Sequence, residues 1–470
     1  MAKFRGVFRH IGQYGIRGTF GLIREKLFID PKRFSARKKR RIPDFPANYL
    51  RAAMPRCPEE HPGFTVLYCL HYFYPKKRGG TERFTLNLAK EAAAVGNRAL
   101  VLTMEGNEPE SLYTERLGNI LFRYYEYSGV RCIGFRYKKA PPGIYYKNIS
   151  EGDSEQAVFA EYILSREGVD IVHATYPQPF ATLLSVCRKR GLPYLVTCTD
   201  FSTLCHYSTM VDRSGDFCRG SDGGARCAAV CPTYGCPDQR ARFIAAKRLL
   251  SGAALVTVPS EFVARVLSAE FRNLPILPIA HGISGDFRYK ERRGPVKRFV
   301  YAGTLSPLKG VHLLIEAFGR LRQQDISLLI YGRGEGGYER ALKRGADERV
   351  RFMGAADAEA MPDIFSSCDC AVIPSIWYET YNFSLREAMR CGALVVAADI
   401  GAMPEAIDEG KNGFLFEAGS VDALYRALCL ALDFDLRSYK PKHFPSTSDE
   451  WDIYSAAYRL AISENRKKRE

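Results

Sequence analysis

Two glutamates and one lysine in the second half of the chain could together bind a phosphorylated sugar. Glu379 follows an apolar run that ends at Pro374, and Glu387 lies in the helical stretch after it. Carboxylates accept hydrogen bonds from neighbouring hydroxyls in pairs, which suits a ribose or a hexose. Lys309 lies near a predicted helix start, where its charge and free backbone amides would attract phosphate. The alternatives are a helix-dipole partner at Glu387 and an ordinary surface lysine.

A glycine pair, Gly79-Gly80, lies between the first apolar run of the chain and the helical stretch that follows it. Glycine lets the backbone approach a ligand closely, because it has no side chain to block the contact. An ordinary turn is the simpler interpretation of the pair alone. It is a candidate site because the same order of strand, loop and helix recurs around Lys309.

Apolar runs of strand length alternate with helical stretches along both halves of the chain. The predicted strands are 64–70, 98–103, 169–173, 194–197, 254–258 and 276–279, then 298–302, 327–331, 350–352, 369–374 and 393–397. This alternation predicts an α/β fold with two doubly wound parallel sheets. Such sheets bind ligands at the carboxyl ends of their strands, where helix N-termini favour phosphate. A nucleoside diphosphate is the ligand that this geometry favours.

A chain of 470 residues is too long for one hydrophobic core. The charged stretch 290–297, which contains proline and glycine, is the predicted linker between two domains. We expect a basic arm over 1–63, a first domain over 64–294 with a cysteine-rich insertion at 205–236, a second domain over 295–440, and a C-terminal segment over 441–470.

Over residues 64–465 the sequence resembles the family 4 retaining glycosyltransferases, whose GT-B architecture has two Rossmann-like domains facing a cleft. The resemblance is most specific over 374–405, where Glu379 and Glu387 have the family's glutamate spacing. It implies that the C-terminal helix crosses back to the first domain. It also implies these donor-binding residues: Gly79, Gly80, Gly303, Thr304, Lys309, Arg333, Glu379, Tyr381, Asn382, Phe383 and Glu387.

The resemblance assigns different parts of the donor to these residues. Lys309 would contact the diphosphate, Glu387 the ribose, and Glu379 the transferred sugar, helped by backbone amides of residues 381–383. Gly79 and Gly80 would line the phosphates.

Two positions depart from the family pattern. The family often has arginine where this chain has Thr304, and Arg333 after the next strand could replace that contact. It also often has histidine where this chain has Thr199. Asp200 is then the candidate catalytic partner in the first domain, and His173, at a strand end, is either a second candidate or a structural histidine.

The resemblance implies transfer of a hexose from a nucleotide diphosphate sugar to an acceptor hydroxyl, with retention at the anomeric carbon. Lys309, Glu379 and Asp200 are the catalytic candidates, and Lys309 would stabilise the departing diphosphate. No cofactor is expected for the chemistry, and the family's acceptors are commonly lipid-linked saccharides of cell-surface polysaccharide or glycolipid synthesis. The alternatives are a sugar-nucleotide epimerase of this fold and a non-catalytic sugar-nucleotide-binding protein. A nicotinamide dehydrogenase is disfavoured, because neither domain's first strand precedes Gly-x-Gly-x-x-Gly.

Five of the fourteen cysteines lie close together in the sequence: Cys205, Cys218, Cys227, Cys231 and Cys236. In a long chain without an export signal they are better interpreted as thiols or metal ligands than as disulfides. Their spacing differs from a standard zinc knuckle. A structural zinc clip and a set of free thiols therefore both stay open.

The net charge of +16 is concentrated at the N-terminus, where residues 1–63 hold fifteen lysines and arginines against five acidic residues. Apolar residues at helical spacing from Phe4 to Ile11 lie among these charges. The pattern favours contact with an anionic membrane surface or a solvated arm, and disfavours nucleic acid. Neither a secretory signal nor a run of about 18 apolar residues is present in the sequence. We expect a cytoplasmic protein, peripheral on the inner face of the membrane.

Overall fold

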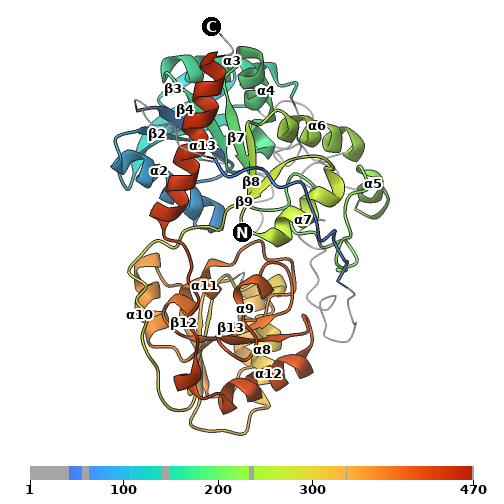
Figure 1. The fold of residues 1–470 in the computed structure, drawn as a ribbon, viewed down its shortest axis with the longest axis vertical. Helices are drawn as coiled ribbons and strands as arrows, with labels where there is room; N and C mark the ends of the chain where they lie inside the picture. The colour runs from blue at the N-terminus through green and yellow to red at the C-terminus, as the bar shows by residue number, and fades with distance from the viewer. Residues whose placement is uncertain are drawn as a thin grey trace.

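The computed structural model describes residues 42–55, 63–106, 108–139, 149, 151–231, 238–334 and 336–467. They form two α/β domains, which lie end to end along the longest axis of the molecule (Figure 1). Each domain contains one sheet packed with helices. The predicted fold class of two Rossmann-like α/β domains is confirmed.

The sheet of the first domain has nine strands in the order β3-β4-β5-β2-β1-β6-β7-β8-β9. Its strands are β1 (Thr65–Leu70), β2 (Arg98–Met104), β3 (Glu115–Leu117), β4 (Ile120–Tyr127), β5 (Val130–Tyr137), β6 (Ile171–Ala174), β7 (Tyr194–Thr197), β8 (Leu255–Val258) and β9 (Ile276–Pro278). Only the pairings of β3 with β4 and of β4 with β5 are antiparallel among these described strands. The sequence did not predict β3 to β5, because charged and tyrosine residues interrupt their apolar pattern.

The sheet of the second domain has six strands, all parallel, in the order β12-β11-β10-β13-β14-β15. They are β10 (Arg298–Ala302), β11 (Ser327–Tyr331), β12 (Val350–Gly354), β13 (Cys370–Ile373), β14 (Leu394–Ala398) and β15 (Gly413–Phe416). The apolar runs predicted the first five of these strands to within two residues. The central strands β13 and β14 are completely or almost completely buried, as expected for a parallel sheet covered on both faces.

Helices connect most of these strands. They are α2 (Gly80–Ala94), α3 (Ser154–Arg166), α4 (Ala181–Arg190), α5 (Ala225–Val230), α6 (Gln239–Ser251), α7 (Glu261–Glu270), α8 (Val311–Gly319), α9 (Gly336–Arg344), α10 (Met361–Ser366), α11 (Phe383–Arg390), α12 (Val421–Asp433) and α13 (Thr447–Lys467). Asp or Ser side chains cap the N-termini of α3, α6, α7 and α12 by accepting first-turn N–H groups. In α2, Phe84, Leu88 and Ala92 recur every fourth residue and are buried.

The last helix, α13, returns to the first domain and packs beside α2 (Figure 1). The Tyr458 hydroxyl lies 2.6 Å from Nδ1 of His173, and the Thr197 hydroxyl lies 2.7 Å from its Nε2. Tyr454 extends this buried network to Thr257 at 2.9 Å. Burial lowers the pKa of His173 to about 3, so the ring is neutral. The structural interpretation of this histidine is confirmed.

Residues 42–55, which belong to the predicted basic arm, lie along the outer strand of the first sheet. Leu50 accepts a backbone hydrogen bond from Ile276 of β9 at 2.9 Å, and Ala52 donates one to the same residue at 3.0 Å. This segment therefore extends the sheet beyond β9. Residues 1–41 and 56–62 of the predicted arm lie outside the described residues.

We expect Tyr458→Phe to lower the free energy of unfolding by about 1–3 kcal/mol, because a buried ring nitrogen of His173 loses its partner. Urea unfolding at neutral pH measures the change. Tyr289→Phe is the matched control, since Tyr289 is about half exposed and should change stability by less than about 0.5 kcal/mol. Equal losses in the two variants would contradict a stabilising role for the network.

Candidate functional site

The predicted site residues lie where the strand order reverses in each sheet. In the second domain, β10 lies beside β13, and the loops after these strands carry Lys309 and Glu379. In the first domain, β1 lies beside β6, and the loop after β1 leads to Gly79 and Gly80. Doubly wound sheets bind ligands at such reversals, because neighbouring loops diverge there and leave a crevice.

Lys309 ends a short 3-10 helix, η4 (Pro307–Lys309), which comes just before α8. Gly310 joins the two helices with a φ of +69°, and a Cβ at this position would fall 1.8 Å from the carbonyl oxygen of Pro374. Only glycine permits this approach, which brings the loop after β10 against the loop after β13. A backbone hydrogen bond of 2.8 Å from Ile376 to Leu308 holds the two loops together.

The Glu379 side chain is buried, and one of its oxygens is shared by three donors. Oε1 accepts from Lys309 Nζ at 2.7 Å, from the Ser375 hydroxyl at 2.7 Å and from the Trp377 indole at 2.8 Å. Burial acts to raise the pKa of Glu379, but the Lys309 charge and these hydrogen bonds outweigh it and hold the pKa below its usual value. The carboxylate is therefore ionised at neutral pH.

Glu387 lies on α11 and forms an ion pair with Arg83 of α2, so the pair joins the two domains. The Glu387 side chain is 2% exposed, and burial raises its pKa against the opposing charge of Arg83. Arg83 also donates to the carbonyl of Ser284 at 3.1 Å and lies 4.9 Å from the centre of the Phe383 ring. The carboxylate predicted to bind the ribose is thus paired with a cation from the first domain.

Sequence reasoning missed Arg83, Ser375 and Trp377. Arg83 lies three residues after Gly80, on the same face of α2, so helical spacing could have marked it as a neighbour of the predicted phosphate loop. Nothing local identifies its partner, because Glu387 lies on a helix of the other domain. Ser375 and Trp377 belong to the motif that contains Glu379, but their donor groups were not assigned.

The N-termini of α2 and α11 meet at the boundary between the domains. A Cβ at Gly80 would lie 3.7 Å from the Phe383 ring. Asn382 caps α11, because its side-chain oxygen accepts from the Leu385 N–H at 2.9 Å. The first-turn amides of a helix have no partner within that helix, so two positive helix ends lie close together here.

The side chains of Tyr381 and Phe383 point to the first domain. The Tyr381 hydroxyl donates to the carbonyl of His281 at 2.5 Å, and the Phe383 ring stacks on the His281 ring with centroids 5.5 Å apart. These side chains join the domains, which leaves the backbone of residues 381–383 for the donor contacts that the family resemblance implies.

Gly303 and Thr304 lie on the loop after β10, and Arg333 lies on the loop after β11. Backbone hydrogen bonds join the two loops. Gly303 donates its N–H to Tyr331 at 2.9 Å, and Leu305 donates to the carbonyl of Arg333 at 3.0 Å. All three predicted residues are exposed. Arg333 therefore lies on the loop beside Thr304, which is where a replacement for the family's arginine would have to lie. Its contact with a diphosphate stays a prediction.

Thr199 and Asp200 follow β7, and Thr199 contacts the second domain. The Thr199 carbonyl accepts from the Thr380 hydroxyl at 2.8 Å, and its own hydroxyl lies 2.7 Å from that of Thr81. Asp200 accepts from the Ser202 N–H at 2.8 Å, and burial raises the pKa of its carboxyl. The structure places Asp200 beside the domain boundary, and its catalytic role stays a prediction.

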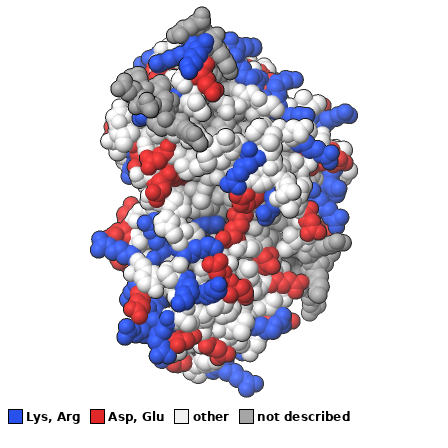
Figure 2. Space-filling view, in the orientation of Figure 1, with Lys and Arg blue, Asp and Glu red and all other residues white. Residues whose placement is uncertain are grey.

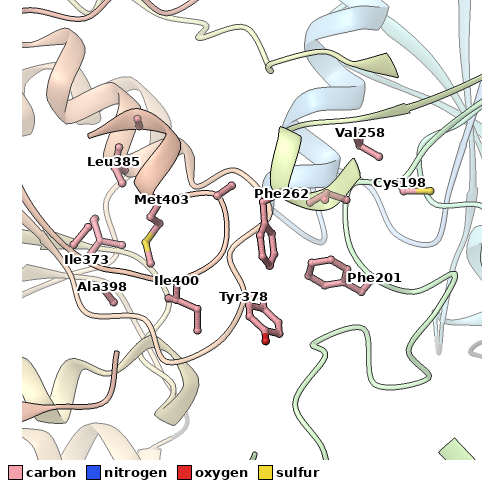
Figure 3. Close-up of a cluster of buried hydrophobic side chains, with 14 of the residues drawn as sticks. Cys198, Phe201, Val258, Phe262, Ile373, Tyr378, Leu385, Ala398, Ile400 and Met403 are labelled. Carbon is pink, nitrogen blue, oxygen red and sulfur yellow. The ribbon is translucent and has the colours of Figure 1, made fainter. Parts of the chain in front are cut away.

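Tyr378, from the second domain, projects into an aromatic cluster of the first domain (Figure 3). Its ring centroid lies 5.0 Å from Phe217, 5.2 Å from Phe262 and 6.3 Å from Phe201. Nearby, the Glu405 carboxylate of the second domain accepts two first-turn N–H groups of α7, at 2.6 and 3.3 Å. The loop that carries Glu379 is therefore fixed to both domains.

Two α/β domains that meet beside the strand reversals of their sheets have the GT-B architecture. Residues 78–286 match the family model described as Glycosyltransferase Family 4, and residues 296–433 match the model described as Glycosyl transferases group 1. The two matches cover the first and second domains in turn. The chain belongs to the family 4 type of glycosyltransferases, which confirms the resemblance found in the sequence.

Individual relatives match part of the chain. A phosphatidyl-myo-inositol mannosyltransferase of Mycobacterium leprae is 34% identical over 132 residues, which are 28% of this chain and 35% of the relative. A glycogen synthase of Thermus thermophilus is 32% identical over 188 residues, 37% of this chain and 41% of the relative. The matched stretches thus span less than half of these relatives' lengths.

A solved structure shares the fold over most of the chain. Anabaena Alr3699/HepE in complex with UDP and glucose aligns with a TM-score of 0.56 and 18% identity, covering 86% of this chain and 98% of that one. At this identity the similarity supports the fold alone.

We expect Arg83→Ala to lower the free energy of unfolding by about 3–5 kcal/mol, because it leaves the buried Glu387 carboxylate without its cation. Adding Glu387→Gln should restore part of the loss. Arg320→Ala, which breaks exposed pairs with Asp422 and Glu316, should cost less than about 1 kcal/mol. Denaturant unfolding of the parent and these three variants measures the changes, and an Arg83→Ala loss no larger than that of the control would refute the buried pair.

Proposed function

We propose that the protein transfers a hexose from a nucleotide diphosphate sugar to an acceptor hydroxyl, with retention of the anomeric configuration. One observation carries the proposal: the Lys309–Glu379 pair lies in the loops before α8 and α11, and the Arg83–Glu387 pair joins α2 to α11, whose N-termini meet at Gly80 and Phe383. Cations and helix ends suit the diphosphate, while carboxylates suit the hydroxyls of a ribose and a hexose.

Each group would act on a different part of the donor. Lys309 and the helix-end amides would stabilise the negative charge that grows on the diphosphate as its bond to the sugar breaks. Glu387 would exchange Arg83 for hydroxyls of the ribose, and Glu379 would bind hydroxyls of the hexose. The acceptor oxygen would bond to the anomeric carbon on the face that the phosphate leaves, and its proton would pass to a donor phosphate oxygen.

Known proteins support the choice of donor and acceptor class. Solved structures of this fold contain UDP, or UDP-glucose, and several partial relatives are named for transfer to inositol compounds. These similarities agree with a nucleotide sugar donor and with a sugar or lipid-linked saccharide acceptor. The product would then belong to the synthesis of cell-surface polysaccharide or glycolipid. An acceptor-dependent product, found by screening nucleotide sugars, separates the proposal from an epimerase and from a binding protein.

Lys309→Ala should lower kcat by about 100- to 1000-fold, because charge on the leaving diphosphate loses its compensating cation. Glu387→Ala should mainly raise the donor KM, and Glu379→Ala should weaken discrimination between donor sugars. Lys309 Nζ lies 2.7 Å from Glu379 Oε1, so the two residues should not act independently. The double variant Lys309→Ala/Glu379→Gln should therefore lose less activity than the fold-losses of Lys309→Ala and Glu379→Gln multiplied together.

Steady-state kinetics and calorimetry with the nucleoside diphosphate measure these effects. Lys343→Ala is the control, since Lys343 pairs with Glu339 on the surface of α9. The donor site would be elsewhere if the three single variants bound the nucleotide like the parent and kept its rates.

We also propose that the basic arm brings the protein to anionic membranes. Residues 1–41 hold thirteen lysines and arginines against two acidic residues. By contrast, basic and acidic side chains are interspersed over the face of both domains in Figure 2. In the described part of the chain, no helix combines the length and apolarity needed to cross a bilayer.

Deleting residues 1–41 should abolish binding to phosphatidylglycerol vesicles, at about 1 kcal/mol for each favourably placed basic residue. Residues 42–55 are kept because they bond to β9. Co-sedimentation measures binding, phosphatidylcholine vesicles are the control, and donor hydrolysis should survive the deletion. Undiminished binding by the truncated protein would exclude this role of the arm.

A further inference from the structure

Four cysteines of the first domain line one small cavity beside α5. Its lining includes Cys205, Cys218, Cys227 and Cys231. The space open to the centre of a water molecule is about 20 Å³, which is room for one water or one metal ion. The four thiols are free of disulfides: Cys205 and Cys218 lie in irregular segments, Cys227 lies in α5, and Cys231 is the C-cap residue of that helix. The fifth clustered cysteine, Cys236, lies outside the described residues.

The segment that carries these thiols has little regular structure to hold it. Between residues 205 and 231 the regular pairing is limited to the six-residue helix α5 and a bridge between Val211 and Phe217. Positive φ angles occur at three non-glycine residues there, Ser208, Met210 and Asp222. The backbone hydrogen bonds of this segment lie mainly in turns between residues close in sequence, so a cross-link between its distant parts would add stability.

The Cys218 sulfur already has a hydrogen-bond donor of the kind that supports metal ligation. The Gly220 N–H donates to this sulfur at 3.4 Å, and such a contact stabilises a thiolate.

We propose that these four cysteines bind one Zn²⁺ ion, which ties the insertion together. As the side chains stand, no group of three or more candidate ligands among the described residues is close enough to hold an ion. Binding therefore requires the sulfurs to turn inward about their Cα–Cβ bonds until each is about 2.3 Å from the metal. Four protons leave as the thiolates form.

The ion would act on the boundary between the domains without joining the chemistry there. Phe217, between the first and second ligands in sequence, packs against Tyr378 of the second domain. Cross-linking the loop on both sides of Phe217 would hold this ring against Tyr378, the residue before Glu379. The zinc proposal is independent of the proposed function, because its test measures metal rather than activity.

The full-length protein, purified without added metal or chelator, should contain about one zinc per chain by plasma mass spectrometry. Titration with a mercurial should release that zinc in step with four thiols. Cys218→Ser and Cys227→Ser should lose the metal, while Cys236→Ser and Cys429→Ser should keep it. Because four protons leave on binding, zinc affinity should rise steeply with pH.

Several results would overturn the proposal. Absence of metal together with free reaction of all the thiols would mean that the cluster is only a set of buried cysteines. Iron in place of zinc would reject the assigned ion. Loss of zinc in Cys236→Ser, or its retention in Cys218→Ser, would reject the ligand set. The mercurial titration uses the parent protein, so it decides the question even where a variant fails to fold.

Discussion

Two carboxylates buried where the domains meet each require a cation, because an unpaired buried charge is strongly destabilising. Lys309 of the neighbouring loop forms an ion pair with Glu379, and Arg83 of the other domain forms one with Glu387. Because the second pair joins the two domains, the Glu387 carboxylate is neutralised only when the domains are docked as they are here. In the proposed function, the hydroxyls and phosphates of a nucleotide sugar would replace some of the contacts that these four side chains make with one another.

The loop after β13 carries a predicted site residue and contacts with the first domain within a few residues. Glu379 faces the site, while its neighbour Tyr378 is packed among aromatic rings of the first domain. Thr380 bonds to the backbone of Thr199 across the same boundary. One loop therefore carries the buried carboxylate and, on both sides of it, residues that contact the first domain, which couples the position of the carboxylate to the docking of the domains.

Local patterns in the sequence predicted most of the fold and the core of the site. Strands such as β10 and β11 follow from their apolar runs, and Lys309 and Glu379 follow from motif and loop position. The pairing of Arg83 with Glu387 does not, because a contact between two domains leaves no trace in the periodicity of either helix. The strands β3 to β5 were missed for a related reason: their stability comes from neighbouring strands rather than from an uninterrupted apolar run.

The return of α13 to the first domain has a consequence for how the chain is made. Trp451, Tyr454 and Tyr458 pack in the same core as Phe64 and Tyr68, which begin the first sheet. A ribosome therefore releases the strands of that sheet long before it supplies the rings that complete their core. The second domain lies between and is contiguous in sequence, so it can close on its own first. The amino-terminal domain is the last of the two to be finished, and a prematurely ended chain would expose its unfilled apolar face.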